Sequence, residues 1–192
     1  SEPAGLSSND AQACCDPTAF SLNRPLVAPL RFAPAPGRLD YIECLFVSDA
    51  AEARPSAIPG SKVHSVETAL NQMAHRLEQG LSHWLIVAVN EAPSLALAAS
   101  PQFCVTRLLQ QARRRWGQAI TLIADVGLSP YQPSGHSVVL RDGHVAVESS
   151  YAAAAALACC FAAAGADAVA PCLSLPQQTA AIRQALDDQG LQ

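Results

Sequence analysis

The sequence predicts an α/β fold in which parallel strands alternate with helices. Two observations indicate this fold: four short, almost continuously apolar runs have the length of buried strands, and each is followed by a segment whose apolar residues recur at helical spacing. The composition agrees, because the 192 residues are 50% hydrophobic and only 15% charged, which suits one compact core and excludes a disordered chain. Parallel strands joined through helices form right-handed crossovers.

The chain opens with a segment that differs from the rest. Prolines recur through residues 1–40 without apolar periodicity, so we expect an irregular N-terminal arm there and a β/α domain over residues 41–192. The first strand is predicted over residues 41–47, where aromatic and β-branched residues form an apolar run. Ser65 can then cap a helix whose apolar stripe ends at Gly80.

The second and third units follow the same pattern. Residues 84–89 predict the second strand, and we expect its helix to open at Ser100-Pro101 and to end at Gly117. Residues 119–125 predict the third strand. Beyond it, an Asp-Gly pair at residues 142–143 is flanked by short apolar runs, which predicts a β-hairpin inserted before the next helix.

The last unit comprises a helix over residues 151–164, capped by Ser149 or Ser150, a strand over residues 167–171 and a helix over residues 176–188. The sequence lacks both Gly-x-Gly-x-x-Gly and the Walker phosphate loop, so neither dinucleotide nor nucleotide binding of those types is indicated. The remaining common option is a parallel (β/α) TIM-barrel type. A closed barrel has eight strands in about 250 residues, so about four units form a half-barrel.

The charge pattern indicates which classes of partner are unsuited to this chain. The net charge is -4 and the basic residues are scattered, which argues against nucleic acid. We interpret the alanine-rich residues 151–164 as a packed helix, and we expect no membrane segment and a cytoplasmic location, since no signal peptide is recognisable. Three arginines, Arg113 to Arg115, are interpreted as a solvated helix end, with an anion site as the alternative.

The segment after the third strand carries the most information. Chemistry in such barrels gathers at the carboxyl ends of strands, and Asp125 ends this strand ahead of a polar loop. Residues 125–137 resemble the porphobilinogen synthase (5-aminolevulinate dehydratase) family, which reads Asp-Val-x-Leu-x-Pro-Tyr and then Gly-His. Four further segments resemble the N-terminal half of that family in the same order: Leu45-Phe46-Val47, Pro55 to Gly60, Gly165-Ala166-Asp167 to Pro171, and Ala181 to Asp187.

The resemblance implies a reaction that this sequence is poorly equipped to perform. The family joins two 5-aminolevulinate molecules through Schiff bases on two lysines of later strands, with a metal at the third-strand loop. The 192 residues contain one lysine, Lys62, which we expect on the surface. The family's metal positions fall on Gly127, Ser129 and Ser137, which are poor ligands for zinc or magnesium, so we expect no metal or other cofactor.

Three polar residues of the family's loop pattern remain: Asp125, Tyr131 and His136. Asp125 could act on a substrate amine or hydroxyl, but without a partner we interpret it as orienting the loop. His136 could carry a proton or bind a metal, yet a histidine beside Gly135 in a polar loop is usually only hydrogen-bonded. These three are weak catalytic candidates, and no substrate-binding residue is assigned.

The sequence therefore supports three hypotheses. The first is a degenerate, non-catalytic member of the family, linked to tetrapyrrole metabolism, that works by association. Its partner would be a second copy of the chain or a separate chain that completes the barrel, because a four-stranded parallel sheet leaves apolar edges exposed. The second is dehydratase activity when a partner chain supplies the lysines. The third is a sensor of a tetrapyrrole or its precursor.

Overall fold

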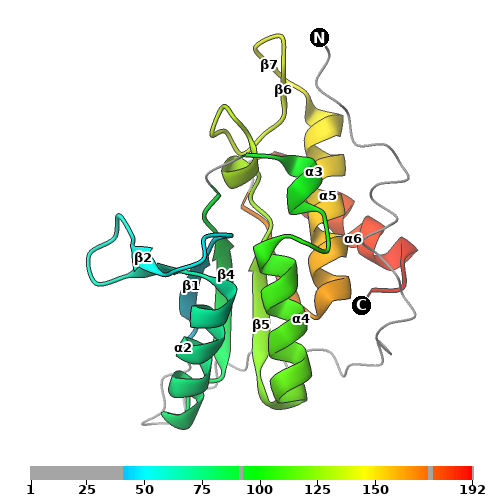
Figure 1. The fold of residues 1–192 in the computed structure, drawn as a ribbon. Helices are drawn as coiled ribbons and strands as arrows, with labels where there is room; N and C mark the ends of the chain where they lie inside the picture. The colour runs from blue at the N-terminus through cyan, green and yellow to red at the C-terminus, as the bar shows by residue number, and fades with distance from the viewer. Residues whose placement is uncertain (1–40, 91–92, 173–174, 192) are drawn as a thin grey trace.

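A parallel sheet forms the centre of the computed structural model, which describes residues 41–90, 93–172 and 175–191 (Figure 1). The predicted arm, residues 1–40, lies outside the described residues. The sheet has the strand order β2-β3-β1-β4-β5-β8. Five strands run parallel, of which β3 Lys62–His64 was not predicted. The other four confirm the predicted order: β1 Glu43–Val47, β4 His83–Ala88, β5 Thr121–Asp125 and β8 Ala168–Ala170.

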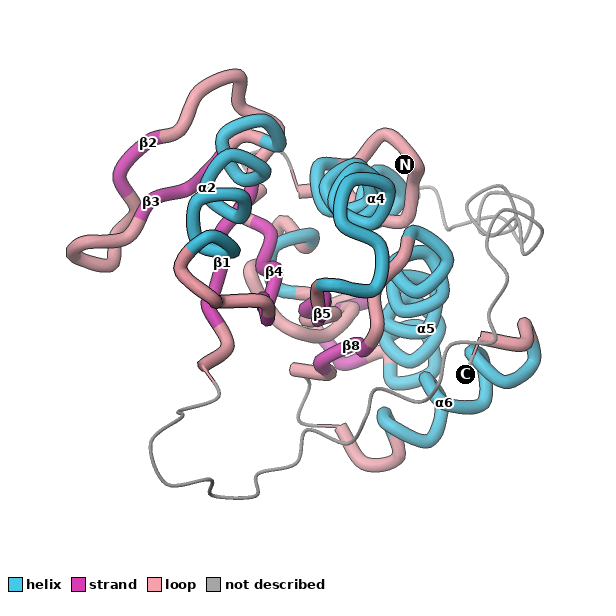
Figure 2. Tube along the Cα trace, turned by 90° about the horizontal axis from the view of Figure 1, so that it is seen from below, coloured by secondary structure: helices cyan, strands magenta, loops and turns pink. Residues whose placement is uncertain are grey.

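The principal helices pack on one side of this sheet. They are α2 Val66–Glu78, α4 Cys104–Trp116, α5 Val147–Ala164 and α6 Gln178–Asp188. In Figure 2 the parallel strands lie along an arc, with α2, α4 and α5 on its outer side. Leu45, Trp84 and Leu122 of the strands and Met73 and Leu108 of the helices are all buried in this layer. Burial of each such side chain contributes about 1.5–3 kcal/mol to folding.

Along β1, β4, β5 and β8 the sheet has a second face, on the inner side of the arc, whose side chains are at most partly buried. Because successive residues of a strand point to opposite faces, the aligned residues Cys44, Leu85, Ile123 and Ala168 lie together on this side. We define the open face by these residues and the row above them: Cys44, Phe46, Leu85, Val87, Ile123, Asp125, Ala168 and Ala170. Apart from Asp125, the open face is apolar.

Of the four predicted helix starts, one agrees with the structure and three differ. The smallest difference is in α6, which is predicted from residue 176 and begins at Gln178. Ser65 caps α2 as predicted, in a capping box with Thr68. The helix expected to open at Ser100-Pro101 instead begins after Phe103, and that dipeptide lies in a turn. A four-residue helix that the sequence analysis did not predict, α3 Leu95–Ala98, precedes this turn.

The predicted caps of α5 are wrong for a tertiary reason. The helix begins at Val147, with Ala146 as its N-cap, so Ser150 lies inside it. The Ser150 hydroxyl donates a hydrogen bond to the Ala146 carbonyl at 2.8 Å and accepts one from the Val139 backbone N–H at 2.9 Å. This serine therefore links Val139, the residue before the hairpin, to the first turn of the helix.

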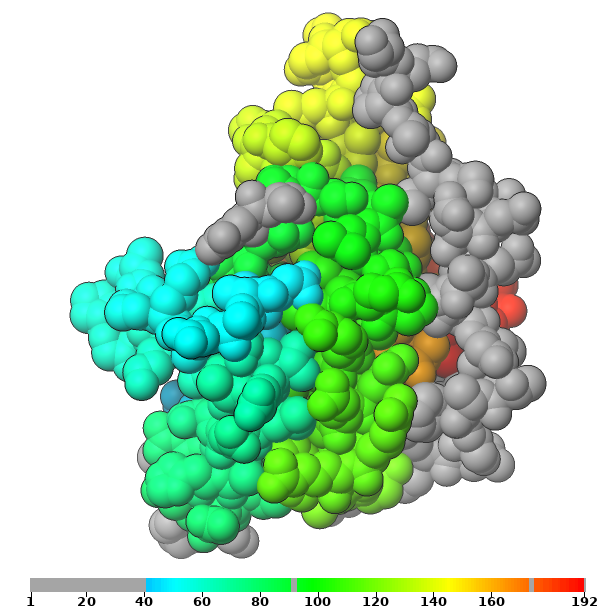
Figure 3. Space-filling model, viewed as in Figure 1, coloured from blue at the N-terminus to red at the C-terminus, as the bar shows by residue number. Residues whose placement is uncertain are grey.

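The fold contains two short antiparallel strand pairs, one that forms a separate sheet and one at the edge of the main sheet. Strands β6 Leu140–Arg141 and β7 His144–Val145 confirm the predicted hairpin, and Asp142 and Gly143 at its tip both have positive φ, as a type I′ turn requires. The space-filling view in Figure 3 shows this hairpin projecting at the top of the molecule. The second pair, β2 Arg54–Pro55 and β3 Lys62–His64, lies between the first predicted strand and the Ser65 cap, where the sequence analysis predicts no strand.

Helix α5 is long and apolar enough to cross a membrane by length and composition, with a mean hydropathy of 1.4 over Val147–Ala164. Half of this helix is buried inside the fold. Its buried side chains, among them Leu157, Cys160 and Phe161, belong to the same core as the strands. This arrangement is that of a packed core helix, the interpretation that the alanine-rich composition suggested.

The interpretation of Arg113 as a solvated residue is wrong. Its side chain is 5% exposed and pairs with Asp167, whose carboxylate lies 2.5 Å away and is 9% exposed. The guanidinium also donates to the Gly165 carbonyl, at 2.9 Å, and Asp167 accepts the backbone N–H of Leu122 at 2.8 Å. The Gly-Ala-Asp segment thus joins α4 and the start of β5 to the turn before β8. Arg114 next to it is exposed.

Candidate functional site

Asp125 lies at the carboxyl end of β5, on the open face beside Ala170 of β8. The strand places it there because Leu122 and Ala124 must face the helices, which leaves residue 125 on the other side. Burial raises the pKa of the Asp125 carboxyl above its ordinary value of 3.8, while a hydrogen bond from the Gly127 backbone opposes this shift. Asp125 is therefore a partly buried carboxylate that can accept hydrogen bonds or exchange a proton.

At residue 127, the first family metal position, the glycine has no side chain, and neighbouring side chains leave little room for one. A Cβ atom added to Gly127 would lie 3.2 Å from Asp125 Oδ2 and 3.2 Å from Cys172 Cβ. The other two family metal positions are serines: Ser129 in the 3-10 turn Ser129–Tyr131, and the partly buried Ser137. A glycine and two neutral hydroxyls do not fit zinc or magnesium. The described residues also contain no group of three or more His, Cys, Asp or Glu side chains that could hold a metal ion.

Tyr131 is part of the core beneath the site. Its side chain is 1% exposed, and its ring packs edge-on against Phe103, with 5.5 Å between the centroids. Burial, followed by the negative charge of Asp125, raises the pKa of the Tyr131 hydroxyl far above its ordinary value. This phenol stays protonated and holds the loop in place through its ring.

His136 lies farther along the same loop, and its side chain is exposed. Its backbone N–H donates to Ser134 Oγ at 3.4 Å, after Gly135 has turned the chain with φ of 69°. Of the three sequence candidates, Asp125 and Tyr131 interact electrostatically. The described contacts of His136 are within its own loop.

Sequence reasoning considered Cys172 only as a thiolate that could bind haem, and it did not place Cys172 or Cys44 near the Asp125 carboxylate. Cys172 follows β8 and lies against Gly127, and Cys44 lies on the open face of β1. Burial, followed by the charge of Asp125, raises the pKa of the Cys44 thiol, which keeps it protonated at neutral pH. The alternation of β1 was a usable signal, because a buried Leu45 puts its neighbour Cys44 on the opposite face.

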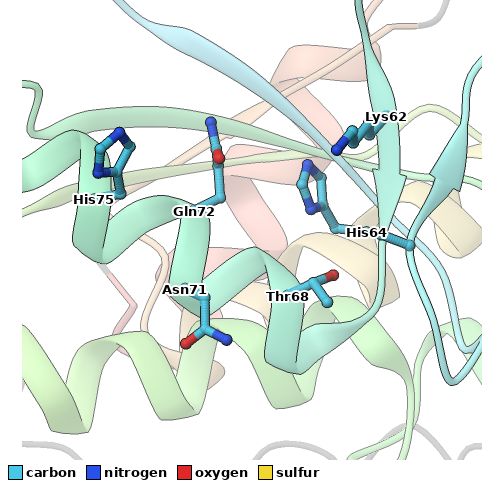
Figure 4. A pocket seen from close by; sticks show the side chains of 7 residues that line it. Lys62, His64, Thr68, Asn71, Gln72 and His75 are labelled. Carbon is cyan, nitrogen blue, oxygen red and sulfur yellow. The ribbon is translucent and has the colours of Figure 1, made fainter.

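Lys62 is exposed, as expected, and lies on the other side of the sheet from Asp125. It belongs to β3 and lines a cavity together with Thr68 and Gln72 of α2 (Figure 4). Helix α2 packs on the outer side of the arc, whereas Asp125 lies on the open face. The one amine side chain of these 192 residues therefore does not point toward the candidate site.

Comparisons with known proteins identify this arrangement. The family model for delta-aminolevulinic acid dehydratase matches residues 36–192. The chain is 32% identical over 137 residues to delta-aminolevulinic acid dehydratase from Methanothermobacter thermautotrophicus, covering 70% of this chain and 41% of the relative. It is 27% identical over 157 residues to the enzyme of that name from Rhodobacter capsulatus, covering 79% of this chain and 47% of the relative.

A solved structure agrees with the sequence matches. Delta-aminolevulinic acid dehydratase (porphobilinogen synthase) from Toxoplasma gondii, in complex with the reaction product porphobilinogen, superposes with a TM-score of 0.73 at 26% identity. The match covers 78% of this chain and 44% of that structure. The chain thus spans less than half the length of these relatives. It belongs to the delta-aminolevulinic acid dehydratase family, and its described residues form part of the family's TIM-barrel fold.

Proposed function

We propose that these 192 residues act by association, as a catalytically silent half-barrel linked to tetrapyrrole metabolism. The observation that carries the proposal is the position of the single lysine, on the opposite side of the sheet from Asp125. Schiff-base capture needs an uncharged amine that attacks a ketone carbonyl and expels water, and such an amine must lie in the same pocket as the bound keto acid. Lys62, exposed beside α2, does not meet that requirement.

The metal positions support the same proposal. Gly127 has no side chain, and a Cβ atom there would lie only 3.2 Å from both the Asp125 carboxylate and Cys172 Cβ. Ser129 and Ser137 supply only neutral oxygen atoms. The described loop is therefore unsuited to hold a metal ion that could act as a Lewis acid, and Lys62 is not placed to form a Schiff base with 5-aminolevulinate there.

The open face supports a role in association. Phe46, Leu85, Val87 and Ile123 form an apolar surface on a parallel sheet, and parallel sheets are normally covered on both faces. The occupant that fits is a second set of parallel strands with its own helices, because the relatives are more than twice as long as the matched region. A complementing barrel half would extend the sheet at β8 and cover the open face.

A second candidate function follows from Asp125. This carboxylate points to the open face and has a raised pKa, so in a completed barrel it would lie in the interior pocket as a proton-exchanging group. A partner half that brings its own lysines would then restore dehydratase activity. The two functions share a partner and differ only in turnover.

One experiment separates these outcomes. The chain is co-expressed with the part of the Methanothermobacter thermautotrophicus protein that it does not match, and the complex is measured by light scattering. It is then incubated with 5-aminolevulinate, with and without zinc or magnesium, and porphobilinogen is measured. We expect a one-to-one complex. Porphobilinogen from the complex would establish the second function, and the absence of any complex would refute association.

The chain alone provides the chemical test. Incubation with 5-aminolevulinate and borohydride should leave its mass unchanged, and a Lys62→Gln variant should behave identically. A reduced adduct on the parent chain that disappears in this variant would overturn the proposal.

Matched substitutions test the surface. Leu85→Glu, in the centre of the open face, should abolish the complex, whereas Leu97→Glu, at a residue of α3 that is 39% exposed, should not. A chain that assembles equally well with both substitutions would show that the open face is not the interface. Assembly of the chain with itself would identify a second copy as the occupant in place of a complementing half.

A further inference from the structure

A surface cavity lies apart from the open face, between β3 and α2. Its volume is about 310 Å³, near the lower limit of cavities that hold small ligands. It is lined by Lys62 and His64 of β3 and by Thr68, Asn71, Gln72 and His75 of α2. Figure 3 shows the segment around β2 and β3 projecting from the side of the molecule next to this helix.

The lining is rich in hydrogen-bond donors and cationic. Of the described residues that line the cavity, none carries a carboxylate, whereas Lys62 supplies an ammonium group. Figure 4 shows the Lys62 and His64 side chains converging above α2, with Gln72 beside them. The chain's single lysine is therefore placed next to an imidazole in a surface depression.

One ring nitrogen of His64 lacks a hydrogen-bond partner among the described residues. This atom, Nδ1, is enclosed. Burial, followed by the charge of Lys62, lowers the pKa of His64, so its ring is neutral at neutral pH and offers one N–H donor. An enclosed ring nitrogen without a partner destabilises the empty site and favours a ligand that supplies one.

Glu43, the acid that affects the pKa of His64, does not pair with Lys62 or His64 in any described contact. Glu43 acts on His64 electrostatically, but its carboxylate is engaged elsewhere. One oxygen lies 3.0 Å from Arg76 Nε, and the other accepts a hydrogen bond from Gln72 Nε2 at 3.2 Å. Glu43 is therefore already neutralised by Arg76, and Lys62 remains without a described carboxylate partner in the cavity.

We propose that this cavity binds a compact oxyanion, a phosphate or a carboxylate group, held by the Lys62 ammonium and the His64 ring. An oxyanion accepts several hydrogen bonds at once, which matches an ammonium beside an imidazole N–H. The proposal is independent of the association function, because the cavity is on the helix-covered side of the sheet.

The test uses histidine ring signals in NMR spectra. Inorganic phosphate and citrate are titrated separately into the full chain, and the shifts of His64 and His75 are followed, with His144 of the distant β6–β7 hairpin as the internal control. We expect saturable shifts of the first two signals only. The anion with the lower dissociation constant identifies the ligand chemistry. Unchanged His64 signals with both anions would overturn the proposal.

Two variants distinguish a built site from general charge attraction. Lys62→Gln removes the charge at an exposed position and should weaken anion binding about tenfold or more, as expected for loss of a charged hydrogen bond. Arg141→Gln, on the β6–β7 hairpin, removes an exposed charge elsewhere and should leave the dissociation constant unchanged. Equal weakening by both substitutions would show that the anion responds only to net charge and would refute the site.

Discussion

Replacement of Arg113 by methionine tests the role of the Gly-Ala-Asp segment. Methionine keeps most of the aliphatic stem but removes the ion pair to Asp167 and the hydrogen bonds to the carbonyls of Gly165 and Ile120. Because Arg113 and Asp167 are 5% and 9% exposed, the loss leaves a buried carboxylate without its cation. Such a loss costs about 3–5 kcal/mol of unfolding free energy. For a chain of this size we expect the melting temperature to fall by roughly 10 °C.

The assay is urea and thermal unfolding, followed by circular dichroism. Arg114→Met is the matched control, since Arg114 is exposed on the same helix turn and should change stability by less than about 0.5 kcal/mol. Adding Asp167→Asn to Arg113→Met should cost about 1–3 kcal/mol less than the sum of the two single changes, because the partners are coupled. If Arg113→Met and Arg114→Met unfold at the same urea concentration, the reasoning is wrong.

Three further predictions concern the site and its scaffold. Burial raises the pKa of Asp125 above 3.8, so the folded state binds the Asp125 proton more tightly than the unfolded state does, and stability falls as the pH rises through the folded pKa. The Asp125→Asn variant should therefore be more stable than the parent at pH 7. In urea titrations this advantage should vanish below about pH 4. Gly127→Cys should form a disulfide with Cys172 on mild oxidation, seen as a loss of two free thiols, because the two Cβ atoms would lie 3.2 Å apart, close to the 3.5–4.5 Å of disulfides. Ser65→Ala should lower the unfolding free energy by about 1 kcal/mol, since it removes the hydroxyl that caps the Thr68 backbone N–H.

Each of these predictions has an outcome that contradicts it. A stability difference between Asp125→Asn and the parent that is constant with pH would exclude a raised pKa. Gln118→Cys, placed at the opposite end of β5, should not pair with Cys172, and equal pairing would show that oxidation is unspecific. Ser61→Ala, in the turn between β2 and β3, should leave stability within about 0.5 kcal/mol, and a loss equal to that of Ser65→Ala would argue against the cap.

Strands and helices were predictable because their signals are local. The apolar run that predicts β4 and the Ser65 cap of α2 depend only on neighbouring residues. The start of α5 was not predictable, because the Ser150 hydroxyl accepts a hydrogen bond from the backbone N–H of Val139, a residue eleven positions away. Arg113 was misread for the same reason: its burial depends on the Gly165 carbonyl, 52 residues farther along the chain.

The candidate site was predictable in part. Asp125 followed from its place at a strand end, and strand alternation alone would also have indicated Cys44. The contact between Gly127 and Cys172 requires knowing that β5 and β8 are neighbours. The cavity beside Lys62 depends on β3, a three-residue strand too short for a clear sequence signal.

The ion pair between Arg113 and Asp167 also bears on how relatives of this protein are recognised in genomes. A residue held in place by folding persists for as long as the fold is needed, whatever becomes of the reaction. Shared Gly-Ala-Asp sequence is accordingly a marker of descent and a poor marker of turnover. Surveys that assign activity to such chains will be more reliable when they score residues 127, 129 and 137 and the presence of pocket amines.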